Sequence, residues 1–332
     1  MKTPRLNLAD VQQAQLRLRG GVRLTPCKPA RMIGQMIGAE VWLKREDLQR
    51  TGSFKERGAR NALLSLSPEE RAQGVIAASA GNHALGLAFH GGALGIKVTV
   101  VMPVNAPSVK ITRCRGLGAN VVLYGSRFED AQEYALQFAA ATGATHLHPF
   151  DDVRVIAGQG TIGLELLEQV RNLDTFVVPV GGGGLLAGVA TAVKALRPNV
   201  RVIAVEPENA AGFLAACLNG SPRSALLAPT LADGLAVSRV GANSFAVAAP
   251  LVDDVVTVSE AEIARAIRVL ARDEGIVAEG AGAVGVAALL AGKISGRSLA
   301  LPIGGRNIDA RLHERIVSGA ADVPEPSFAR AA

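Results

Sequence analysis

Short runs of uninterrupted apolar residues alternate along most of the chain with longer Ala-rich segments of helical periodicity. Strands that are apolar at every position are buried on both faces, so these runs predict mostly parallel sheets covered by helices. We expect strands at 41–44, 75–79, 98–103, 120–124, 175–180, 200–206 and 299–303. The alternation predicts an α/β fold with open sheets, in which ligands bind beyond the carboxyl ends of the strands.

The same alternation suggests two lobes. The segment 51–148 has strands and helices of its own, which predicts a small domain. Residues 1–50 and 149–324 would then form the large domain, and residues 325–332 a frayed tail.

Composition and charge limit the kinds of molecule that we expect the protein to bind. The 332 residues carry 35 Lys and Arg against 29 Asp and Glu, and aromatic residues make up only 4%. The positive charge is dispersed, which disfavours a nucleic acid partner and suits a small anionic substrate or cofactor. No apolar stretch is long enough to cross a membrane, and the charged amphipathic start is unlike a signal peptide. Cys27, Cys114 and Cys217 are widely spaced, so we expect buried thiols in a reducing compartment and a cytoplasmic protein.

Four glycines follow the apolar run 175–180 and lead directly into an Ala-rich helix. Glycines let the backbone approach a phosphate closely, and the free N–H groups of a helix start attract an anion. The segment therefore predicts a phosphate cradle, although a plain turn is the simpler alternative. It also fits a dinucleotide fingerprint, with Gly182, Gly184 and Ala187 as GxGxxA and Glu206 closing the next strand, so a NAD-binding Rossmann-type protein stays open.

Lys55 lies in the first turn of a predicted helix that Ser53 can cap. The positive end of a helix disfavours an ammonium and lowers its pKa, which is the tuning that an amine needs to form a Schiff base or act as a base. A solvated surface lysine is the plain alternative, and the neighbouring Phe54 could be ordinary core.

Two more strand ends carry polar groups. Ser79, Gly81, Asn82 and His83 lie between a strand and a helix, where they can bind a carboxylate or merely cap the helix. After the run 299–303, Gly304, Gly305, Arg306 and Asn307 repeat the arrangement of strand, glycines and helix.

Taken together, TGSFKERGA, SAGNHALGLA, PVGGGGLLAG, LADGLAV and AEGAGAVGVAAL, in this order, resemble the fold-type II pyridoxal-phosphate enzymes, which share the tryptophan synthase beta-like fold. The branch is that of threonine/serine dehydratases and serine racemases. The resemblance implies that Lys55 holds pyridoxal 5'-phosphate covalently and removes the substrate α-proton. The other residues that it implies for the cofactor are Phe54, Asn82, Gly181, Gly182, Gly183, Gly184, Leu185, Gly234, Glu279 and Gly304. Those that it implies for the substrate carboxylate are Ser79, Ala80, Gly81, Asn82 and His83.

The chain departs from these relatives at three places. Ala80 stands where racemases of the branch carry a second serine that moves a proton, which favours elimination over racemisation. GGRN replaces the usual SGGN, so Gly304 occupies the position of the residue that meets the pyridine nitrogen. Arg306 could then contact the cofactor or the substrate, or point away into an ion pair. Glu206 and Ala210 match a divalent-cation segment, but Gly212 replaces its aspartate, so we expect no obligatory metal.

We therefore expect a dehydratase (ammonia-lyase) that converts an L-3-hydroxy amino acid, such as threonine or serine, to a 2-oxo acid and ammonia. A larger hydroxy amino acid of the kind met in hydroxyectoine breakdown, and serine racemisation, remain alternatives. The partner would be a small amino-acid substrate, with no nucleic acid and no membrane. The relatives also suggest a homodimer.

Overall fold

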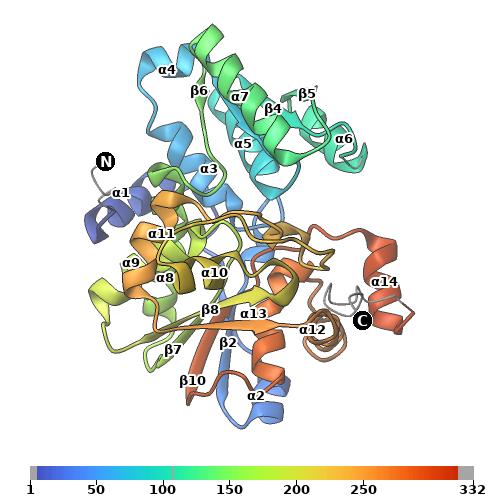
Figure 1. The fold of residues 1–332 in the computed structure, drawn as a ribbon. Helices are drawn as coiled ribbons and strands as arrows, with labels where there is room; N and C mark the ends of the chain where they lie inside the picture. The colour runs from blue at the N-terminus through green and yellow to red at the C-terminus, as the bar shows by residue number, and fades with distance from the viewer. Residues whose placement is uncertain (1–5, 107, 321–332) are drawn as a thin grey trace.

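The computed structural model describes residues 6–106 and 108–320 and contains two sheets, each with helices around it (Figure 1). The large sheet has the order β1-β2-β10-β7-β8-β9 and the small sheet β5-β4-β3-β6. The strands are β1 Cys27–Pro29, β2 Glu40–Lys44, β3 Val75–Ala78, β4 Val98–Met102, β5 Asn120–Leu123, β6 Thr145–His146, β7 Thr175–Pro179, β8 Arg201–Pro207, β9 Asp254–Val258 and β10 Ser298–Pro302. Every pairing is parallel except that of β1 with β2.

The helices lie between and around these strands (Figure 1). The α-helices are α1 Leu8–Leu18, α2 Arg31–Ile37, α3 Lys55–Leu64, α4 Pro68–Gln73, α5 Asn82–Leu94, α6 Ser108–Gly116, α7 Phe128–Thr142, α8 Val153–Gln169, α9 Gly184–Leu196, α10 Gly212–Asn219, α11 Ala242–Ala248, α12 Glu260–Asp273, α13 Gly280–Leu290 and α14 Ala310–Ser318. Short 3-10 turns are η1 Glu46–Leu48, η2 Glu208–Ala210, η3 Asp233–Leu235 and η4 Ala249–Leu251.

All seven predicted strands are present, and the expected parallel α/β architecture is confirmed. The prediction missed β1, β6 and β9. The first two have only three and two residues, and β9 is a half-buried edge strand whose Asp254 and Thr257 break the apolar run. The small sheet is built entirely from residues 75–146, inside the predicted small domain, while the exact domain limits stay a prediction. The predicted frayed tail, 325–332, lies outside the described residues.

Glycines let three central helices pack at backbone distance. A Cβ on Gly188 of α9 would lie 2.3 Å from the carbonyl oxygen of Ile156 in α8, and one on Gly158 of α8 would lie 2.7 Å from Cα of Gly58 in α3. Any larger residue would separate these helices. Because α3 begins at Lys55 and α9 begins at Gly184, this packing fixes the two helix starts relative to each other.

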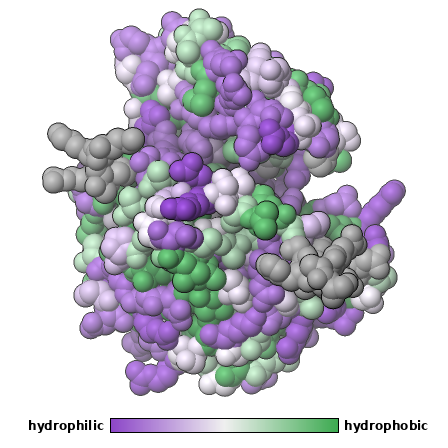
Figure 2. Space-filling model, in the orientation of Figure 1, coloured by the Kyte–Doolittle hydropathy of each residue, from purple (hydrophilic) through white to green (hydrophobic). Residues whose placement is uncertain are grey.

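The surface carries no single large apolar face in the view shown. Hydrophilic residues cover much of that face, and the hydrophobic residues form separate small groups (Figure 2). Within the described ranges, no helix is both long and apolar enough to span a bilayer. Of the three thiols, Cys114 is buried and Cys27 half-buried, but Cys217 is exposed. The expectation of buried thiols was therefore wrong for Cys217, because the last turn of α10 faces solvent.

Candidate active site

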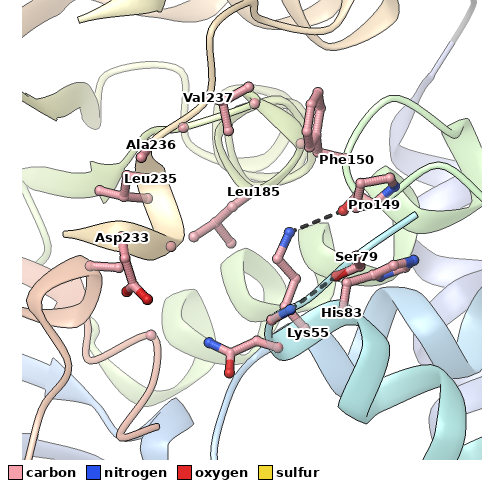
Figure 3. Close-up of a pocket in the computed structure, with 18 of the residues that line it drawn as sticks. Lys55, Ser79, His83, Pro149, Phe150, Leu185, Asp233, Leu235, Ala236 and Val237 are labelled. Atoms are coloured by element: carbon pink, nitrogen blue, oxygen red, sulfur yellow. Dashed lines mark hydrogen bonds between the residues drawn. The ribbon is translucent and has the colours of Figure 1, made fainter. Parts of the chain in front are cut away.

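One cavity of about 280 Å³ brings the predicted residues together. It lies beyond the carboxyl ends of β3 and β7, where strand ends meet the first turns of α3, α5 and α9 (Figure 3). Every residue that the resemblance assigned to cofactor or substrate lines this cavity: Phe54, Lys55, Ser79, Ala80, Gly81, Asn82, His83, Gly181, Gly182, Gly183, Gly184, Leu185, Gly234, Glu279 and Gly304. Three of the other candidates, Glu206, Ala210 and Arg306, do not line it.

Lys55 is the first residue of α3, and its amine extends into the cavity (Figure 3). Nζ donates a hydrogen bond of 3.0 Å to the carbonyl oxygen of Pro149 and lies 5.4 Å from the centre of the Phe54 ring. Burial lowers the pKa of Lys55 to about 8, although the Glu279 carboxylate acts in the opposite direction. The lowered pKa agrees with the prediction, but its main cause is burial rather than the helix end. A neutral amine is therefore accessible near neutral pH.

The glycine loop is shaped by its neighbours as well as by its helix. Gly183 is the N-cap of α9, with φ of 91°, a conformation that favours glycine. A Cβ on Gly182 would lie 2.1 Å from the Phe150 ring, and one on Gly181 would lie 2.9 Å from Cα of Leu235. Within the part of the chain that the structure describes, the N–H groups from 181 to 185 donate no hydrogen bond between elements or to a side chain. They are therefore available to an anion in the cavity.

The loop between β3 and α5 forms the opposite wall. Ser79 Oγ accepts a hydrogen bond of 3.3 Å from the N–H of Gly81, which leaves its own proton free to be donated. His83 is buried, and its ring has no side-chain hydrogen-bond partner among the described residues, while the Leu147 backbone is a polar group beside it. Burial, with Lys55 and His148 nearby, keeps the pKa of His83 well below its ordinary value, so the ring is neutral. His83 therefore contributes a buried, neutral ring to this wall of the cavity.

Asn82 and Glu279 meet at the other end of the cavity. Asn82 Nδ2 donates to Glu279 Oε1 at 2.8 Å, and Asn307 holds both residues, as described below. Burial, followed by the nearby Asp233 carboxylate, raises the pKa of Glu279 to about 7. Close to neutral pH this carboxyl group can therefore exchange a proton with little change in free energy.

Two structural facts bear on the modified GGRN segment. Gly304 lies against Phe54, whose N–H donates to the Gly304 carbonyl at 2.9 Å. Arg306 is exposed and does not line the cavity, so this conformation lends no support to a contact with cofactor or substrate. The described residues offer it no ion pair either, which was the alternative expectation.

Glu206 has a structural role instead of facing a ligand. It is completely buried, and its two oxygens accept the N–H groups of Phe213 and Leu214 at 2.7 and 2.8 Å. A carboxylate held in this way does not reach a ribose hydroxyl, so the NAD-binding alternative loses its acidic residue. In the described ranges no three metal-ligating side chains come together, and the need for a metal stays a prediction.

Sequence reasoning missed several residues of the wall. Lys110 and Asp233 line the cavity and form an ion pair of 3.1 Å across it, and Phe128 and Phe150 supply apolar surface. Asp233 adjoins the predicted Gly234 and could have been noticed. Lys110 lies in a basic surface helix, and nothing in its local sequence marks it.

Comparison with known proteins agrees with this geometry. Residues 18–303 match the family model described as pyridoxal-phosphate dependent enzyme. The chain is 47% identical, over 94% of its length and 78% of the relative's, to an L-threonine ammonia-lyase of Thermotoga maritima. The processed form of threonine deaminase isoform 2 from Solanum lycopersicum superposes with a TM-score of 0.88 at 37% identity, covering 95% of this chain and 88% of that one. Serine racemase of Dictyostelium discoideum gives a TM-score of 0.86 at 37% identity, covering 92% of this chain and 99% of that one. The chain belongs to the pyridoxal-phosphate dependent enzyme family.

Proposed function

We propose that this protein is a pyridoxal-phosphate dependent ammonia-lyase acting on an L-3-hydroxy amino acid of the threonine or serine type. The observation that carries the proposal is that the Lys55 amine and the uncommitted N–H groups of residues 181–185 line the same cavity. An amine of lowered pKa beside an anion cradle is what a phosphorylated aldehyde requires. The similarity to threonine ammonia-lyases supports the choice of reaction.

The residues fit the cofactor on structural grounds. The N–H groups at the start of α9 would hold the phosphate, Phe54 would lie against the ring, and the Asn82 amide would donate to the ring hydroxyl. When bound, pyridoxal phosphate supplies an aldehyde carbon for the amino group and a conjugated ring that takes up the charge left by the α-proton. Gly234, Glu279 and Gly304 would border the ring.

The chain's own groups would then orient the substrate and move its protons. The Ser79–His83 loop would bind the carboxylate through its N–H groups and the Ser79 hydroxyl, which places the α-carbon toward Lys55. Lys55 Nζ, with a pKa of about 8, would accept the α-proton. The β-hydroxyl would take up a proton and leave as water, so that the lost α-proton and hydroxyl balance as one water molecule. The released enamine would tautomerise to an imine, and addition of water to that imine would give a 2-oxo acid and ammonia. The methyl group of Ala80 cannot donate a proton to the substrate α-carbon from the face opposite Lys55, which supports elimination over racemisation.

The first experiment tests the cofactor. Purified protein should show a visible absorption band that borohydride bleaches, and Lys55→Ala should abolish both the band and the activity. Lys28→Ala, an exposed lysine on β1, is the matched control and should retain both. A colourless wild-type protein that binds NAD would refute the proposal.

The second experiment tests the substrate. Threonine, serine, 3-hydroxyaspartate and hydroxylated diamino acids are compared by release of 2-oxo acid and ammonia. We expect the highest kcat/KM for threonine or serine. Preference for the diamino acids would favour the larger-substrate alternative, and formation of D-serine without 2-oxo acid would favour a racemase.

A cytoplasmic location and a homodimeric state are further parts of the proposal. The free cysteines support a reducing compartment. Light scattering of the purified protein, which should give twice the 34.2 kDa chain mass, tests the dimer.

A further inference from the structure

Asn307 connects three separate parts of the candidate site. We propose that Asn307 is a positioning residue that sets the orientation of the Asn82 amide and of the turn before Lys55. We further propose that Arg113, reaching across from the small lobe, holds Asn307 in place. This inference rests on the proposed cofactor chemistry of the same cavity. It adds two residues that contact neither the lysine amine nor the phosphate cradle.

The hydrogen bonds of Asn307 use nearly all of its polar groups. Its Nδ2 donates to Asn82 Oδ1 at 2.6 Å and to the carbonyl oxygen of Thr51 at 2.9 Å. Its backbone N–H donates to Glu279 Oε2 at 3.1 Å. Its Oδ1 accepts a hydrogen bond of 3.1 Å from Arg113 Nη1. A half-buried residue with four such bonds has one orientation that satisfies all of them.

The chemistry of the partners fixes which end of each amide faces which group. A guanidinium only donates and a peptide carbonyl only accepts, so the Asn307 amide cannot be flipped between Arg113 and Thr51. Its nitrogen must therefore face Asn82, which turns the Asn82 oxygen toward Asn307 and the Asn82 nitrogen toward Glu279. The second Nδ2 hydrogen of Asn82 is then the one available to a ligand. Without Asn307, Asn82 could present its oxygen to the cavity instead.

The same residue supports the turn that leads to Lys55. Gly52 has φ of 83°, and a Cβ there would lie 2.8 Å from Asn307 Oδ1, so the turn and the amide are in close contact. The N–H of Arg306 donates to the Gly52 carbonyl at 2.9 Å, and Ser53 pairs with Gly305 in an isolated bridge. Asn307 therefore ties the segment before Lys55 to the loop after β10.

Arg113 brings the small lobe into this network. It lies on α6, which packs against α5 and β5, whereas Asn307 follows β10 of the large sheet. Lys110, one turn earlier on α6, pairs with Asp233 of the large lobe. The helix thus makes two polar contacts with segments that adjoin the large sheet, and among the described residues the contact of Arg113 is the one that leads to the Asn82 amide through Asn307.

Four variants of the full-length holoenzyme test the proposal: Asn307→Asp, Arg113→Met, Arg113→Lys and, as a matched control, Arg115→Met. Asp replaces the donating amide by a carboxylate of the same shape, which faces the oxygens of Thr51 and Asn82. Arg115 is exposed, two positions along α6. The measurements are affinity for pyridoxal phosphate, the visible absorption band, hydrogen exchange of peptides containing residues 51–55 and 82–85, and kcat and KM separately.

We expect Asn307→Asp to weaken cofactor affinity about ten-fold or more, to displace the absorption band and to speed exchange at 51–55. Arg113→Met should shift each readout in the same direction, with affinity lower by about two- to five-fold, because its hydrogen bond is exposed. Arg113→Lys should recover most of that loss, and Arg115→Met should match wild type. Wild-type exchange, band and affinity in Asn307→Asp would overturn the proposal, as would equal effects of Arg113→Met and Arg115→Met. A wild-type protein without a cofactor band would instead refute the proposed function, and the exchange data would still decide whether Asn307 holds the turn.

Discussion

A buried ion cluster beneath Lys55 permits a quantitative prediction. Arg57, two residues after Lys55 on α3, is 1% exposed and donates to Glu46 at 2.7 and 2.8 Å and to Glu165 at 2.6 and 2.8 Å. Lys44 also pairs with Glu165 at 2.6 Å. The cluster joins β2, η1, α3 and α8, so it fixes the helix that carries the amine.

The perturbation is Arg57→Met, which keeps much of the side-chain volume and removes the charge. It leaves the fully buried Glu46 carboxylate without its main partner, and an uncompensated buried charge costs about 3–5 kcal/mol. For 332 residues the unfolding entropy is about 0.7 kcal/mol per degree, so Tm should fall by about 4–7 °C. Arg127→Met is the control, because the Arg127 side chain is 71% exposed in its ion pair with Asp130, and we expect a loss of less than about 1 kcal/mol.

The pH dependence of the stability loss in Arg57→Met distinguishes an unpaired buried charge from a packing defect. Burial alone would raise the pKa of Glu46, but Arg57 holds it below its usual value. In wild type the carboxylate therefore contributes stability above its unfolded pKa, and this contribution is lost as the pH falls through the folded pKa. In the variant, burial without Arg57 raises the pKa of Glu46 in the folded state. Glu46 therefore takes up a proton on mild acidification, and the free-energy cost of burying its unpaired charge decreases.

The difference in Tm between wild type and Arg57→Met should accordingly be largest near neutral pH and narrow toward about pH 5. Calorimetry or fluorescence-detected melting at several pH values measures it. A loss no larger than that of Arg127→Met, or a loss that does not change with pH, would refute the reasoning.

Three further predictions concern the cavity. Gly183→Ala places a Cβ 3.0 Å from Ser244 at positive φ, so cofactor affinity should fall and the free energy of unfolding should drop by about 1–3 kcal/mol. Gly220→Ala, which is also at positive φ but far from the cavity, is the control and should lower stability alone. Equilibrium dialysis measures the affinity, and thermal melting measures the stability. Because burial lowers the pKa of Lys55 to about 8, the rate at which apoenzyme takes up pyridoxal phosphate should rise with pH around a midpoint near 8, and stopped-flow absorbance showing a midpoint near about 10 would contradict this. Ala80→Ser, which adds a hydroxyl where the chain has a methyl, should increase the D-serine formed per 2-oxo acid released, and chiral chromatography showing no increase would argue against Ala80 as the determinant.

Local sequence was sufficient to predict most of the strands and most of the residues that line the cavity. Apolar runs identified seven of the ten described strands, and glycines with polar residues at the strand ends marked segments that line the cavity. These signals are local, since burial on both faces requires an apolar run and a backbone approach to an anion requires glycine. The sequence by itself therefore determined the fold class, and with the family resemblance that its motifs carry it pointed to Lys55 and to the glycine loop.

Only the tertiary structure decided which residues surround Lys55 and the glycine loop. The electrostatic environment of Lys55 depends on burial and on Glu279, which lies 224 residues away in the sequence. Lys110 meets Asp233, and Arg113 meets Asn307, because α6 faces loops that adjoin the large sheet. Arg306, for which the motif left open a ligand contact or an ion pair, is exposed and does not line the cavity. Pairings between distant segments depend on how helices and sheets pack in three dimensions, and neither hydrophobic periodicity nor motif spacing along one segment specifies that arrangement.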